Sequence, residues 1–120
     1  MSSPGLGYLR DTQLSAATAL NTVAFGRSVQ GYGAVAVYVI GAGTITGGTV
    51  MIETADYAQA AEQASYGGTW SPVLPVPAVN VTGNAQQMVV LPPAPYSYVR
   101  TRISGAITGG GSVSTTLLAT

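Results

Sequence analysis

The sequence contains no cysteine, no histidine and no lysine among its 120 residues. Without cysteine the chain can form no disulfide and no zinc–sulfur site, and it offers no thiolate nucleophile. Without histidine it lacks the commonest general base and metal ligand of enzymes. We therefore expect a protein that is not an enzyme, with no catalytic residue, no bound metal and no cofactor.

Charge of either sign is also scarce. Charged residues make up 7% of the chain, against about 25% in ordinary proteins. Four arginines balance four acidic residues, and we expect no nucleic-acid partner because DNA and RNA binding needs many basic phosphate contacts. A net charge near zero promotes association. We therefore expect a homo-oligomer, a dimer or a trimer, with much of its surface covered by partners.

The length of the chain suits about one domain, which is enough to bury a core without cross-links. The longest apolar stretch, "AVAVYVIGAG", is half of the roughly 20 residues that cross a membrane, so we expect no membrane partner. The first residues lack the basic start and apolar centre of a secretory signal. We expect residues 1–15 to form an N-terminal arm that docks elsewhere through Leu6, Tyr8 and Leu9, and residues 16–120 to form the domain.

Short strands dominate the predicted domain. In "YGAVAVYVIG" three valines, Val35, Val37 and Val39, share one face, and Tyr38 lies on the other face among alanines. Because both faces are apolar, this strand is predicted to be central or covered on its outer side. "GTVMIET" alternates in the same way, and the intervening "GAGTITGG" predicts a hairpin between the two strands.

Seven or eight such segments recur at intervals of roughly ten residues, the pattern of an antiparallel β-sandwich or jelly roll. One segment, "DYAQAAEQASYGG", breaks the pattern. Asp56 is followed three residues later by Gln59, as at a capped helix start, and Gly67 and Gly68 would end a helix. The sequence therefore predicts an all-β sandwich with one short helical or loop insertion.

Three carboxylates lie on or near that insertion, namely Glu53, Asp56 and Glu62. Oxygen ligands suit calcium, and two carboxylates at a set separation suit a glycosidase. The D-x-D-x-D-G spacing of a calcium loop is absent, so a solvated helix start with Asp56 as its cap is the favoured interpretation.

Aromatic side chains near predicted loops could stack on a sugar ring at the surface. The candidates are Tyr57, Tyr66, Trp70 and Tyr96. A large apolar anchor in the core is the favoured interpretation for Trp70. A surface glycan stays open as a partner.

The segment "YSYVRTRIS" holds two of the four arginines. Alternation predicts that Val99 and Ile103 face inward and that Tyr98, Arg100 and Arg102 face outward. The two guanidinium groups would lie about 7 Å apart along the strand. They could meet carboxylates across the sheet or across a subunit interface. We favour the interface, because arginine is enriched at interface anchors and a solvated face would usually carry more charge.

The motifs "GTITGGTVMIET", "TWSPV" and "YSYVRTRISGAITGGGSVSTTLLAT" together resemble a β-sandwich module common in virion structural proteins of tailed bacteriophages. The resemblance covers roughly residues 16–120, and the insertion replaces a tighter turn usual in that module. It implies a structural role as a capsid decoration or cement protein that binds and stabilises the shell. A tail, fibre or carbohydrate-binding module at the virion surface is the alternative. The implied partners are the major capsid protein or other virion proteins, and the implied location is the virion.

Overall fold

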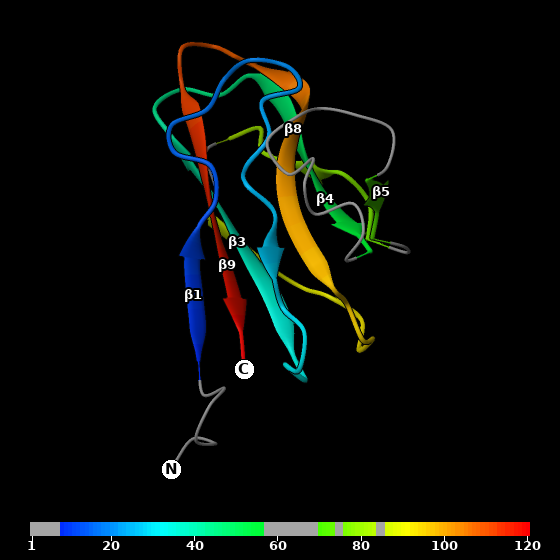
Figure 1. The fold of residues 1–120 in the computed structure, drawn as a ribbon. Helices are drawn as coiled ribbons and strands as arrows, with labels where there is room; N and C mark the ends of the chain where they lie inside the picture. The colour runs from blue at the N-terminus through cyan, green and yellow to red at the C-terminus, as the bar shows by residue number, and fades with distance from the viewer. Residues whose placement is uncertain (1–7, 57–69, 74–75, 84–85) are drawn as a thin grey trace.

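A computed structural model describes residues 8–56, 70–73, 76–83 and 86–120 of the chain. These residues form two antiparallel sheets that pack face to face (Figure 1). The four-stranded sheet has, in spatial order, β1 (Leu9–Thr12), β9 (Ser112–Ala119), β3 (Val35–Ala42) and β7 (Gln86–Val90). The five-stranded sheet has β2 (Arg27–Ser28), β8 (Tyr98–Thr108), β4 (Gly47–Ala55) and β5 (Ser71–Pro72), with β6 (Val79–Asn80) also paired to β4. The predicted all-β sandwich is confirmed.

The core lies between the sheets and is built by the alternation seen in the sequence. Val37 and Val39 of β3 are fully buried, and so are Val99 and Ile103 of β8. One polar pair lies within this core, where the hydroxyls of Thr101 and Thr115 meet at 2.7 Å. Because each hydroxyl can both donate and accept, the pair is satisfied without an ion or water.

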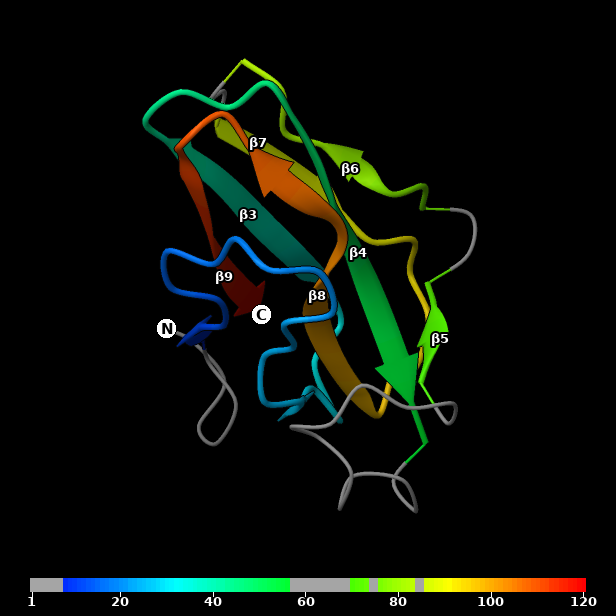
Figure 2. The same cartoon turned by 90° about the horizontal axis from the view of Figure 1, so that it is seen from above.

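The predicted hairpin between the valine strand and the next strand is wrong. β3 and β4 lie in different sheets, which separate into two layers when the molecule is viewed from above (Figure 2). β3 instead pairs with β9, and β4 pairs with β8. The glycine-rich link therefore crosses from one sheet to the other. Both strands can then bury their apolar faces against one shared core.

The link between β8 and β9 crosses between the sheets in the same way, and the two crossings pack together at one end of the sandwich (Figure 1). The backbone N–H of Thr46 donates to the carbonyl of Thr108 at 2.9 Å. A Cβ on Gly111 would lie 2.5 Å from the carbonyl oxygen of Ala42. Glycine is thus required at position 111, because a larger residue would not fit between the two links of the chain.

The boundary expected at residue 16 is not where the sheet begins. Leu9–Thr12, in the second half of the expected arm, form strand β1 and pair with β9 from Leu9↔Ala119 to Thr12↔Thr116. The buried side chains of Leu9 and Leu14 explain this placement, because they extend the core past the edge of β9. Residues 1–7 and the predicted helical or loop insertion at 57–69 lie outside the described residues.

Candidate functional site

Two arginines share one carboxylate on the outer face of the five-stranded sheet. Glu53 lies opposite Arg100 in the β4–β8 pair, and Met51 lies opposite Arg102. Arg100 Nε donates to Glu53 Oε1 at 2.9 Å, and Arg102 Nε donates to Glu53 Oε2 at 2.8 Å. The exposed fractions of the three side chains are 5% for Glu53, 0% for Arg100 and 13% for Arg102. The cluster is therefore an internal one, although it lies on the side of the sheet away from the apolar core.

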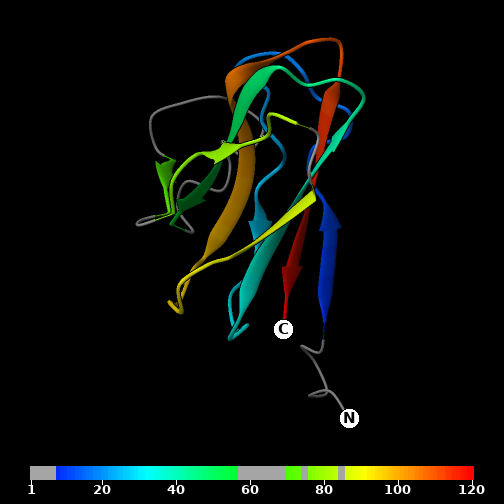
Figure 3. The same ribbon diagram turned by 180° about the vertical axis from the view of Figure 1, so that it is seen from behind.

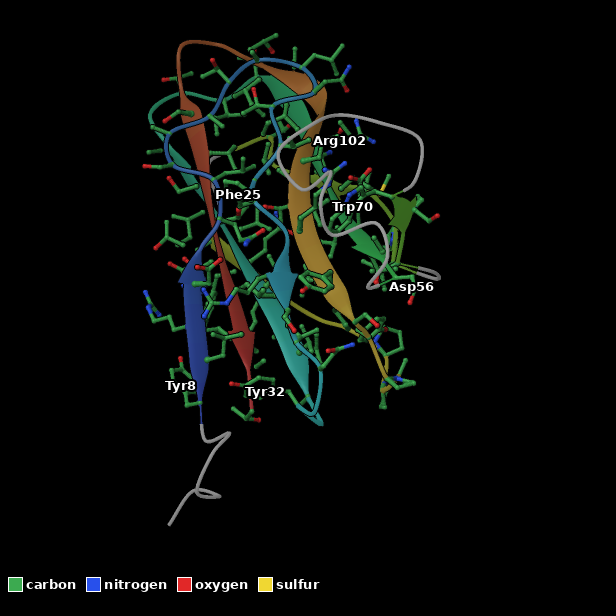
Figure 4. All side chains as sticks on the ribbon, in the orientation of Figure 1. Tyr8, Phe25, Tyr32, Asp56, Trp70 and Arg102 are labelled. Carbon is green, nitrogen blue, oxygen red and sulfur yellow. The ribbon has the colours of Figure 1, made fainter. Side chains whose placement is uncertain are left out.

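Two further described side chains, Trp70 and Asn21, contact the arginines. Trp70, which comes directly before β5, lies against Arg100 with its ring centroid 4.3 Å from the guanidinium carbon, and Figure 4 shows Trp70 and Arg102 beside β8. Asn21 accepts a hydrogen bond from Arg102 at 2.9 Å. Its backbone φ of 64° is left-handed, a conformation that asparagine tolerates better than most residues. The conformation presents the amide to the arginine.

The electrostatics of the cluster explain why it needs all its members. Among the described residues, the cluster places two guanidinium groups and one carboxylate in a location with little water. Removing charges from water costs several kcal/mol per ion, which only short, directed hydrogen bonds offset. The Trp70 ring adds a cation–π contact to Arg100. The indole Nε1 of Trp70 is itself buried and has no hydrogen-bond partner among the described residues.

In this geometry the buried carboxylate of Glu53 serves as the shared acceptor of two arginines. Both of its oxygens already accept hydrogen bonds from arginine, and its side chain is buried. Asp56 is exposed at the end of β4, and Glu62 lies outside the described residues. Within the described ranges, no group of three or more His, Cys, Asp or Glu side chains could hold a metal ion.

The structure brings some of the predicted interface residues together and separates the others. Arg100 and Arg102 do lie on the face opposite Val99 and Ile103, but the acceptor they share belongs to the same chain. Tyr98 precedes both arginines as the first residue of β8 and is half-buried. A contact between these residues and another subunit stays a prediction.

Two of the other predicted interface residues, Tyr8 and Leu9, lie on the β1 side of the sandwich. Tyr8 is 60% exposed, whereas Leu9 is buried in β1. Leu6 lies outside the described residues. Figure 4 shows Tyr8 and Phe25 projecting from the β1 side of the molecule.

Sequence reasoning named Glu53 but missed its role, and it missed Asn21 altogether. The position of Glu53 in the sequence was the available signal. An acidic residue on an alternating strand with an apolar inner face is expected to lie on the outer face and to need a basic partner there. Its pairing with Arg100 follows from the β4–β8 register, which joins residues 47 positions apart in the chain. Asn21 precedes a threonine in a segment without alternation, and nothing local marks it as a partner of β8.

Several large apolar side chains are exposed on the described surface. They are Tyr8, Leu20, Phe25, Met88 and Val90, each more than half exposed. Scattered apolar residues are normal on protein surfaces. Here they accompany a surface from which three of the eight charged groups have been withdrawn into the Glu53 cluster.

Two hollows flank Tyr96 in the loop before β8. One of about 410 Å³ lies beside Asp56 and Ser71, and the other, of similar volume, lies beside Gln30 and Tyr32. The Tyr96 hydroxyl donates to the carbonyl of Pro92 at 2.7 Å. Burial raises the pKa of the Tyr96 phenol above its usual value, because a phenolate would be poorly solvated there.

Comparison with known proteins gives a fold neighbour and no family. No protein-family model matches the chain, and no curated protein matches it in sequence. The crystal structure of the SPBc2 prophage-derived protein YomS is similar in fold, with a TM-score of 0.56 over 93% of this chain and 91% of that chain. The two sequences are 12% identical, so the likeness concerns the fold. In the part of the chain that the structure describes, no helix is long and apolar enough to cross a membrane.

Proposed function

We propose that this chain is a non-enzymatic structural protein of a phage virion, a capsid decoration or cement protein that binds and stabilises the shell. The observation that carries the proposal is the character of the described surface. It exposes Tyr8, Leu20, Phe25, Met88 and Val90 while the Glu53 cluster draws three charges inward. A surface of this kind suits contact with other proteins, whose interface cores are depleted in charge and rich in aromatic residues and methionine.

The similarity in fold to YomS also supports a phage-related role. YomS is prophage-derived and shares the sandwich over nearly the whole of both chains. The proposal adds a place for this chain on the virion and a partner, the major capsid protein or another virion protein. Self-association as a dimer or trimer belongs to the proposal, because a shell offers repeated, symmetric sites.

The experiment is to locate the chain in particles of the virus that encodes it. Purified particles are analysed by mass spectrometry and by electron cryo-microscopy. We expect the chain in purified particles and density for the sandwich at regular positions on the outside of the head. Particles lacking the chain should lose their genome at lower temperature. Density confined to the tail would favour the tail or fibre alternative, and absence from particles would contradict a virion role altogether.

A carbohydrate-binding module is the second candidate, favoured by the hollows around Tyr96. Tyr32 and Tyr96 offer aromatic rings there, and Gln30 and Asp56 offer polar groups. The burial of Trp70 counts against this candidate. Its indole ring packs against Arg100 and is therefore not exposed for stacking on a sugar. Binding to a glycan array that disappears in Tyr96→Ala, while the variant stays folded, would favour the module over the cement protein.

A further inference from the structure

Strand β7 leaves one edge of the four-stranded sheet open. The backbone N–H of Leu91, directly after the strand, donates to the carbonyl of Val35 on β3 at 2.9 Å. Backbone groups of alternate residues point to opposite sides of a strand. The N–H and C=O groups of Gln86, Met88 and Val90 therefore point away from β3. No other segment among the described residues pairs with this side of β7 (Figure 3).

The composition of β7 differs from that of the other edges. An edge strand is usually protected by charge, by proline or by being very short. β1 has four residues and carries Arg10 and Asp11, β2 has two residues and carries Arg27, and β5 has two residues and ends in Pro72. β7 has five residues, "QQMVV", with no charge, proline or glycine. It is therefore the edge best able to accept another strand.

The side chains on the outer face of this edge are also apolar. Met88 is 54% exposed and Val90 is 63% exposed. They lie opposite Tyr38 and Ala36 on β3. An apolar groove of about 260 Å³ continues from Val90 and Ala36 past Leu118. An added strand would thus bury apolar side chains as well as satisfy backbone groups.

We propose that a second copy of this chain pairs with β7 in antiparallel register, about a two-fold axis at Met88. Met88 then lies opposite Met88 of the second copy, and Gln86 lies opposite Val90. This register is the self-complementary one in which all the outward N–H and C=O groups of the three edge residues are paired. Two four-stranded sheets become one sheet of eight strands. This inference specifies how the self-association in the proposed function would occur. It rests on the proposed self-association and not on the proposed virion role.

Charge is the reason to choose a second copy over a strand of another protein. A two-fold axis brings every group near it close to its own duplicate, so charges near the axis would repel. The strands of this sheet carry only Arg10 and Asp11, both on β1. β1 is three strands away from β7, or about 14 Å, which exceeds the screening length of about 10 Å at 0.1 M salt. The axis therefore lies on the part of the four-stranded sheet whose described strands, β3 and β7, carry no charged residue.

The test measures the oligomeric state of the full chain by analytical ultracentrifugation over a micromolar concentration series. We expect a dimer. Met88→Lys should raise the dimer dissociation constant by more than about tenfold, because it places two ammonium groups opposite each other. Thr12→Lys is the matched control, because Thr12 lies in the same cross-strand row on the opposite edge, through Thr116 and Tyr38. It should leave the dissociation constant unchanged.

A cross-linking experiment tests the register itself. The chain has no native cysteine, so Met88→Cys carries a single thiol. A short bis-maleimide should join two Met88→Cys chains efficiently and two Thr12→Cys chains poorly. A monomeric parent, a Met88→Lys variant that still dimerises, or a dimer that Met88→Cys fails to cross-link would each overturn the inference.

The outcomes separate this inference from the virion role. If Met88→Lys is monomeric and still binds particles, the β7 pairing is supported in solution and the cement role does not depend on it. A dimer with the expected cross-link that never occurs in particles would overturn the virion role and keep the pairing. A stable monomer whose β7 captures a virion protein instead would identify another protein as the occupant and overturn the second copy.

Discussion

The guanidinium carbon of Arg100 lies 4.3 Å from the ring centroid of Trp70, and both side chains are buried. The same arginine donates to Glu53 Oε1 at 2.9 Å, so its guanidinium group contacts both a carboxylate and the indole ring. Trp70 is the only tryptophan of the chain. Its fluorescence therefore reports on the Glu53 cluster, and the first two predictions use it.

Replacing Arg100 by alanine should destabilise the fold. The change leaves Glu53 Oε1 without its donor while Arg102 still pairs with Oε2, and an unsatisfied buried acceptor costs about 1–3 kcal/mol. Denaturant unfolding followed by Trp70 fluorescence measures the loss. Arg27→Ala is the control, because its 3.5 Å pair with Asp11 is half exposed and such pairs contribute about 0–1 kcal/mol. Equal losses in the two variants would contradict the internal role of Arg100.

Replacing Glu53 by glutamine should also destabilise the fold, although the shapes of the two side chains match. The amide supplies one acceptor oxygen where two are used, and it turns an N–H donor toward one of the arginines. The loss should reach at least about 3 kcal/mol, because both guanidinium groups lose the buried carboxylate that they share. Asp56→Asn, at an exposed position, should stay within about 0.5 kcal/mol of the parent. A Glu53→Gln variant as stable as Asp56→Asn would show that the carboxylate charge is not needed.

Adding a methyl group at Gly111 should push the two sheet crossings apart. A Cβ there meets the carbonyl oxygens of Ala42 at 2.5 Å and Thr44 at 2.7 Å. Overpacking of this kind costs about 1–3 kcal/mol, seen as a lower midpoint of thermal unfolding. Gly33→Ala is the control, because the nearest atom to its Cβ would lie 4.0 Å away. A Gly111→Ala midpoint equal to that of Gly33→Ala would mean that the crossings are not in close contact.

Tyr96 should make stability depend on pH in the alkaline range. Its folded pKa is raised above 10.0 by burial, so the unfolded chain releases the phenolic proton first. The contribution is present below about pH 10 and is lost as the pH rises through the folded pKa. Unfolding measured at several pH values between about 9 and 11 should show a steeper loss for the parent than for Tyr96→Phe. Parallel curves for the two proteins would rule out the effect.

The alternation of single strands was readable from the sequence alone. Val35, Val37 and Val39 are buried together as predicted, and Val99 and Ile103 face the core opposite the arginines. The physical reason is that side chains of a strand alternate with a period of two whatever the strand pairs with. Composition likewise excluded disulfides and thiolate chemistry, because those need cysteine.

The order of the strands and the partner of the arginines were decided by the tertiary structure. The local pattern around "GAGTITGG" fits a hairpin and a crossing between sheets equally well. The chain takes the crossing, with β3 paired to β9 and β4 paired to β8. Glu53 and Arg100 are 47 residues apart, and no local feature of either strand selects that register. Two strands with apolar inner faces can bury those faces in several different pairings. Only the packing of the whole sandwich buries Glu53 and Arg100, which lie on the outer face of their sheet.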